Sequence, residues 1–88
     1  MISKMAPENL PGWQLIENGK LHRRFQFKDF VEAFSFLTAV ALESEKLGHH
    51  PEIYSVYNKV EIWLTTHDAG GLTDLDYKLA QIIDGIAA

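Results

Sequence analysis

Residues 29–51 read DFVEAFSFLTAVALESEKLGHHP, and this stretch decides the fold because it predicts one long helix with both ends marked. Asp29 can cap the helix, and Glu32 stands three residues later, as a capping box requires. Gly48 is typical of the positive-φ position just past a helix, and the proline three residues further on prevents continuation. The sequence therefore predicts a helix that starts after Asp29 and runs to about Leu47.

Apolar side chains cover more of this helix than one buried stripe needs. Phe30 begins a row that recurs at helical spacing through Phe34, Leu37 and Ala41. Further apolar residues lie on other faces, at Val31, Phe36, Val40 and Leu42. One apolar face is therefore surplus to a single core.

The chain before this helix predicts a β-hairpin. Residues 13–16 and 21–27 flank Asn18-Gly19, the strongest short hairpin signal, because both turn residues tolerate positive φ. Arg23 interrupts an otherwise apolar row in the second strand, which places it near the sheet margin.

The chain after the helix predicts a second hairpin. Residues 53–57 and 60–66 flank Asn58-Lys59, an acceptable but weaker turn. We expect Ile53 to pair with Leu64. The residues that precede the first strand and those that follow the second then lie beyond the same open end of the hairpin.

A last helix follows the stretch 67–71, which we expect to be flexible. Thr73 can cap it, with Asp76 at the third helical position. Its predicted buried stripe consists of Leu75, Leu79, Ile82, Ile83 and Ile86.

The order strand, strand, helix, strand, strand, helix predicts an α+β fold, a four-stranded antiparallel sheet with two main helices packed on one face. We expect one domain over residues 1–88. Within it, residues 1–12 form a loosely held N-terminal arm with room for one short helix.

Composition and charge narrow the function classes. A chain of 88 residues leaves no room for a separate cofactor-binding domain, and a net charge of −4 with scattered basic residues disfavours direct nucleic-acid binding. No apolar run approaches the roughly 20 residues that a membrane span requires. We therefore expect a soluble intracellular protein, in the cytoplasm with the nucleus as an alternative. A small core without cysteine also favours self-association.

Residues with catalytic capacity gather at two corners of the chain. His49 and His50 follow the long helix, and His67 follows the last strand. Because both corners lie beyond the same open end of the second hairpin, the three rings can converge on one pocket. Imidazole titrates near neutral pH and suits proton transfer, which typically contributes roughly 10²–10⁴-fold in rate.

Simpler interpretations stand beside this one. His22, alone in a strand, is interpreted as a solvated polar residue. A zinc site is the alternative functional interpretation of the histidines. However, neighbouring histidines rarely point at one ion, and the chain has neither a thiolate nor an HExxH helix. Asp76 is explained by helix capping alone, although it could reach His67. Glu45 opposes the helix dipole, which hints at another task.

The spaced polar residues resemble the signature of the pterin-4a-carbinolamine dehydratases, and the animal-type members in particular. The matching positions are Glu45, His49, His50, Pro51, Tyr57, His67 and Asp76. The similarity extends over roughly residues 13–86. Gly48 stands where some relatives carry an acid.

The resemblance implies dehydration of 4a-hydroxytetrahydropterin, the product of aromatic amino acid hydroxylases, to quinonoid dihydropterin in tetrahydrobiopterin recycling. It implies that His49 and His67 act as acid–base groups and that His50 holds the reduced pterin. Glu45 and Asp76 would orient or tune the histidines. No cofactor and no metal are implied, since no redox change occurs.

The family also implies a homodimer joined edge to edge through its sheets, and a homotetramer through the long helix. The alternative function is a binding module in which that helix pairs with the dimerisation region of a transcription factor, as in the coactivator relatives. All three histidines are present here, which favours the enzyme.

Overall fold

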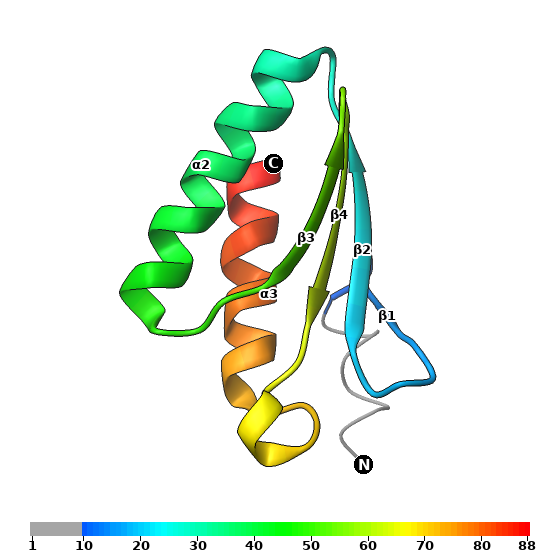
Figure 1. Cartoon of the computed structure of the whole chain (residues 1–88), viewed down its shortest axis with the longest axis vertical. Coiled ribbons are helices and arrows are strands. Elements are labelled where there is room, and N and C mark those ends of the chain that lie inside the picture. The colour runs from blue at the N-terminus through cyan, green and yellow to red at the C-terminus, as the bar shows by residue number, and fades with distance from the viewer. Residues whose placement is uncertain (1–9) are drawn as a thin grey trace.

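The computed structural model describes residues 10–88, so most of the predicted N-terminal arm and its optional helix lie outside the described residues. Two strands, a long helix, two strands, a short 3-10 helix and a last helix follow in order (Figure 1). Their bounds are β1 Gln14–Leu15, β2 Leu21–Gln26, α2 Phe30–Leu47, β3 Glu52–Val56, β4 Lys59–Leu64, η1 His67–Ala69 and α3 Asp74–Ala87.

All strand pairs are antiparallel, and the strands lie in the order β1-β2-β4-β3. Both helices cover the same face of this sheet (Figure 1). The predicted α+β architecture is therefore confirmed.

One hydrophobic core lies between the sheet and the helices. Because strand side chains alternate between faces, every second residue of β2 and β4 points at the helices. Its buried members are Leu10, Trp13, Leu21, Phe25, Ala33, Phe36, Val40, Val60, Ile62, Leu64, Leu79, Ala80 and Ile83.

Arg23 interrupts this apolar face because it has a partner on α3. Its Nη1 donates to Asp84 Oδ1 over 2.6 Å, and the buried Trp13 Nε1 donates to the same oxygen over 2.8 Å. β1 pairs with β2 only as far as His22, so within residues 10–88 β2 has no neighbouring strand on that side from Arg23 onward. This agrees with the predicted place of Arg23 near the sheet margin. The cluster fastens the start of the sheet to the last turn of α3.

Helix α2 begins and ends as predicted, with one change in its capping. Asp29 Oδ1 accepts from the Glu32 amide over 2.9 Å, but Glu32 Oε1 accepts from the Lys28 amide over 2.8 Å. The returning bond therefore goes one residue further back than a capping box places it. Gly48 ends the helix with φ +72°, and its amide donates to the Ser44 carbonyl over 2.9 Å.

The surplus apolar face of α2 is real. The face packed on the core carries Ala33, Phe36, Val40 and Ser44. Phe30, Val31, Phe34 and Leu42 are exposed instead. The long helix therefore carries a second apolar surface that this one chain does not cover.

The second hairpin differs from its predicted register. Ile53 pairs with Ile62 rather than with Leu64, so the register moves by two residues. The turn is Tyr57-Asn58, with Tyr57 at φ +54°, and not Asn58-Lys59. Asn58 is held there because its carbonyl accepts from the Phe27 amide over 2.8 Å and its Nδ2 donates to the Phe27 carbonyl over 2.9 Å.

The predicted stripe of α3 is also partly wrong. Leu75 is exposed, and the buried positions are Asp76, Leu79, Ala80 and Ile83. The buried face is rotated so that a carboxylate enters the interior at the first turn. No helix among residues 10–88 combines the length and the apolar character that a membrane crossing requires.

The sheet face away from the helices carries a charged cluster around His22. The His22 ring stacks on Trp63 with centroids 4.9 Å apart, and its Nε2 lies 2.8 Å from Glu61 Oε1. His22 is therefore largely covered, which corrects its interpretation as a solvated residue. The hydrogen bond from His22 holds the pKa of Glu61 below its ordinary 4.5; partial burial opposes this, and the charge of Arg24 adds to it.

This lowered pKa makes a stability prediction. Because the folded pKa of Glu61 lies below the unfolded value of 4.5, its contribution is present above about pH 4.5 and is lost as the pH falls through the folded pKa. Glu61→Gln should therefore destabilise the protein at neutral pH, and the gap to the parent should narrow at acid pH. Urea unfolding followed by tryptophan fluorescence from about pH 3 to about pH 7 measures this.

Glu17→Gln, an exposed change in the β1–β2 turn, is the matched control and should leave the pH dependence of stability unchanged. A gap between Glu61→Gln and the parent that is constant across the range would contradict the assignment.

Candidate functional site

A pocket of about 220 Å³ lies at the end of the sheet where β4 stops. The bend between α2 and β3 supplies one wall and η1 supplies the other, and both lie at the lower end of Figure 1. The lining residues are Gly48, His49, His50, Thr65, Thr66, His67 and Asp68. The three predicted histidines therefore share one hollow.

His49 is held by a buried carboxylate. Its Nε2 lies 2.6 Å from Asp76 Oδ1, and Asp76 has no exposed surface while His49 retains 9%. A carboxylate can only accept, so Nε2 is the nitrogen that carries the proton. In the neutral ring, Nδ1 then carries the lone pair and can accept a proton.

The second oxygen of Asp76 is occupied too. Oδ2 accepts from the Thr73 amide over 2.9 Å and from the Thr66 hydroxyl over 2.7 Å. Capping therefore uses one oxygen of Asp76 and His49 uses the other. Helix capping alone does not explain this residue, and its imidazole partner is His49 rather than His67.

Tyr77, the next residue along α3, has a raised phenol pKa because of burial, and the charges of Asp76 and Asp74 add to the effect. The phenol is therefore uncharged at neutral pH.

His50 has a partner of a different kind. Its Nε2 lies 2.8 Å from Glu45 Oε1, in the last turn of α2, and both side chains are mostly exposed to solvent. Such an exposed pair contributes little to stability, typically about 0–1 kcal/mol. This pairing accounts for a carboxylate that opposes the helix dipole.

His67 is the first residue of η1 and is exposed. The stretch that we predicted to be flexible is a short 3-10 helix, closed by a bridge between Thr66 and Gly71. Gly70 makes the turn possible with φ +71°. Among residues 10–88, no side chain hydrogen-bonds the His67 ring.

Two residues fall outside the predicted pattern. Tyr57, a signature position, lies in the β3–β4 turn at the other end of the sheet and is 61% exposed. Thr66 contacts Asp76 and lines the pocket, but no spacing or periodicity in the sequence singles it out. Its position just before His67 was the one available hint.

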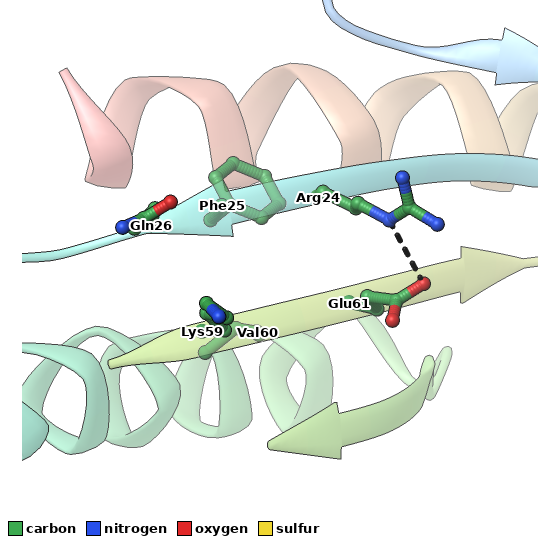
Figure 2. A pocket seen from close by; sticks show the side chains of 6 residues that line it. All are labelled: Arg24, Phe25, Gln26, Lys59, Val60 and Glu61. Carbon is green, nitrogen blue, oxygen red and sulfur yellow. Dashed lines mark ion pairs between the residues drawn. The ribbon is translucent and has the colours of Figure 1, made fainter. Parts of the chain in front are cut away.

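Figure 2 shows another hollow, of about 370 Å³, at the opposite end of β4. It lies between Arg24 and Gln26 on β2 and Lys59 and Glu61 on β4. Arg24 Nε lies 3.5 Å from Glu61 Oε1, and no imidazole lines the hollow. It therefore lacks the imidazoles that line the first pocket.

The residues that the structure describes contain no group of three or more His, Asp and Glu side chains able to hold one metal ion.

These features define a small α+β protein with an imidazole-lined pocket at the open end of its sheet. Comparison with protein families adds a match to pterin 4 alpha carbinolamine dehydratase over residues 2–86. The chain therefore belongs to the pterin-4a-carbinolamine dehydratase family.

Individual relatives agree with this assignment. A protein of Sinorhizobium fredii, provisionally named a pterin-4-alpha-carbinolamine dehydratase, is 55% identical over 90% of this chain and 76% of its own. A Synechococcus protein with the same provisional name is 58% identical over 88% of this chain and 82% of its own.

Two solved structures share the fold. A Brucella melitensis protein described as a transcriptional coactivator/pterin dehydratase superposes with a TM-score of 0.94 at 43% identity, covering 97% of this chain and 92% of its own. A pterin dehydratase-like protein described as a RuBisCO assembly factor in the alpha-carboxysome gives 0.76 at 26% identity, covering 88% and 90%. The fold is thus found in proteins described by more than one function.

The buried contact between His49 and Asp76 predicts a stability loss. Three donors hydrogen-bond the two oxygens of Asp76. In Asp76→Asn only one acceptor oxygen remains, and the NH₂ group, itself a donor, faces one of these donors. The free energy of unfolding should fall by about 1–3 kcal/mol. Chemical denaturation at neutral pH measures this.

Asp74→Asn is the matched control, because it changes an exposed acid in the same first turn of α3. Equal small losses for the two variants would show that Asp76 acts through the helix terminus alone.

Proposed function

We propose that this protein dehydrates 4a-hydroxytetrahydropterin to quinonoid dihydropterin by histidine acid–base catalysis. The observation that carries the proposal is the His49–Asp76 pair, which leaves Nδ1 of His49 as an acceptor in a pocket shared with His67. The family assignment supports the substrate class.

The reaction removes one proton from ring nitrogen N5 and one hydroxyl group from C4a. His49 Nδ1 accepts the N5 proton, the C4a–O bond breaks, and the electron pair from N5 forms the C4a=N5 double bond. His67 gives a proton to the departing hydroxyl, which leaves as water. The two imidazoles exchange protons with solvent afterwards, so the overall reaction is balanced without a redox cofactor.

The two carboxylates, Asp76 and Glu45, differ in burial, and we assign them different roles. Asp76 is fully buried, so its charge stabilises the imidazolium that forms on His49, as the carboxylate of a catalytic triad does. Glu45 is exposed and orients His50, which stands at the pocket rim and holds the pterin. His49 and His67 are thus the acid–base groups, and His50 contributes to binding.

Tetrahydrobiopterin recycling in the cytoplasm is the context that we propose, because aromatic amino acid hydroxylases release 4a-hydroxytetrahydropterins. The nucleus is the alternative compartment if the coactivator function below applies.

The catalytic roles predict that substitutions of the two acid–base histidines lower turnover. His49→Ala and His67→Ala should each lower kcat by about 10²–10⁴-fold, since each removes a proton-transfer group. The loss of absorbance of freshly generated 4a-hydroxytetrahydropterin follows the reaction, with the spontaneous rate subtracted.

His22→Ala is the control, because this histidine belongs to the outer sheet face and should leave kcat near that of the parent. Unaccelerated dehydration by the parent, or parental activity in His67→Ala, would contradict the proposal. Activity that disappears on exhaustive chelation and returns with zinc would favour the metal alternative.

The exposed apolar face of α2 favours a second candidate function, helix-mediated binding. Phe34 is 56% exposed and its ring lies 5.7 Å from that of Phe30, so the two form one patch. We infer that a second copy covers this patch in a homotetramer, and that β3, exposed at every residue, joins sheets edge to edge in a homodimer. A transcription factor dimerisation helix is the alternative occupant, as the description of the Brucella protein as a coactivator suggests.

This assembly predicts a separable effect of Phe34→Glu. A charge in the apolar patch should lower the molar mass measured by light scattering after size exclusion, while dehydratase activity is retained because the pocket lies elsewhere. Lys78→Glu, an exposed change on α3, should leave the mass unchanged. A monomeric parent at micromolar concentration would contradict the assembly.

A further inference from the structure

We propose that Thr66 is a positioning residue, whose hydroxyl fixes the Asp76 carboxylate so that it directs the base nitrogen of His49 into the pocket. The inference rests on the proposed function and adds a residue that the family signature positions do not include.

The hydrogen bonds around Thr66 have a defined direction. Its hydroxyl has one proton, which goes to Asp76 Oδ2 over 2.7 Å, because an ionised carboxylate has none to give. The contact of 2.7 Å between the Thr66 and Thr73 hydroxyls therefore has Thr73 as its donor. The hydrogen bonds therefore run from the Thr73 hydroxyl to the Thr66 hydroxyl and from there to Asp76 Oδ2. His49 donates to the other carboxylate oxygen, Oδ1.

Helix capping does not require the Thr66 hydroxyl. The α3 cap is served by the Thr73 amide, which donates to Asp76 Oδ2 from the same helix start. Thr66 comes from the other wall, where β4 leads into η1, and it adds a second donor to that oxygen. Two donors from different directions restrict rotation of the carboxylate, which keeps Oδ1 on His49.

The backbone of Thr66 is held independently of its hydroxyl. Its amide donates to the Gly71 carbonyl over 3.0 Å in the bridge that closes η1. Thr66→Val therefore removes the hydroxyl at nearly constant shape, and Thr66→Ser keeps the hydroxyl and removes the methyl group. This pair separates hydrogen bonding from packing.

The expected effect is on turnover rather than on substrate binding. A hydrogen bond to a charged group corresponds to roughly 10- to 100-fold in rate when it acts through the transition state. Thr66→Val should therefore lower kcat by at least about tenfold with KM little changed. Thr66→Ser should stay within about threefold of the parent kcat.

The position of the His49 proton gives a readout that does not depend on activity. In ¹⁵N-labelled protein, the parent should show His49 with its proton on Nε2 and a low-field proton resonance from the bond to Asp76. Thr66→Val should shift or broaden that resonance, and the signals of His50 should stay in place. If the parent lacks dehydratase activity, the proposed function fails, while this spectrum still decides the role of Thr66.

Thr73→Val tests the direction of these hydrogen bonds. Thr66 still donates its proton to Asp76 when Thr73 loses its hydroxyl. This variant should retain the His49 resonance and most of the parental kcat. Equal damage from Thr73→Val and Thr66→Val would assign the effect to the helix cap and overturn the proposal. An unchanged spectrum and kcat in Thr66→Val, or a loss confined to KM, would overturn it as well.

Should Thr66→Val fail to fold, Thr66→Cys replaces it, since a thiol of similar size is a weak donor. A parental His49 resonance and kcat in that folded variant would overturn the proposal, and losses of both would support it.

Discussion

The buried carboxylate of Asp76 is the constraint on which the pocket end of the molecule depends. It lies at the first turn of α3 and accepts from His49, which follows α2, and from Thr66, which follows β4. Burying a carboxylate away from solvent destabilises the fold unless hydrogen-bond donors satisfy it. The folded state therefore brings these three segments into contact. The same contacts that satisfy the charge therefore assemble the pocket.

The sequence predicted the architecture well because its strongest signals are local. Asn18-Gly19, the cap at Asp29 and Gly48 at the end of α2 each act within a few residues. The first hairpin and both ends of α2 form where predicted, although only Gly19 of the turn pair takes a positive φ. The register of β3 and β4 was wrong because it depends on Asn58 bonding to Phe27, a contact between distant segments. The rotation of α3 that exposes Leu75 has the same kind of cause, since it follows from Asp76 turning inward towards His49.

For the site, the sequence predicted that His49, His50 and His67 converge, and all three line one pocket, but residue patterns alone did not separate His49 from His50. His49 and His50 are adjacent and chemically identical, and their difference is environmental, because one ring is enclosed and the other faces solvent. Thr66 escaped notice because a hydroxyl next to a histidine carries no pattern. The surplus apolar face of α2 lies away from the pocket, so the association and the chemistry that we propose would use different surfaces of one small fold.

The left-handed backbone at Gly48 has a consequence for which residues this position can accept. A Cβ atom built there meets nothing within 4 Å, so a larger residue has space, yet φ of +72° strains most L-amino acids. Asparagine and aspartate enter this region most readily among the non-glycine residues. Peptide geometry rather than lack of space should thus restrict substitution of Gly48, with asparagine and aspartate tolerated best.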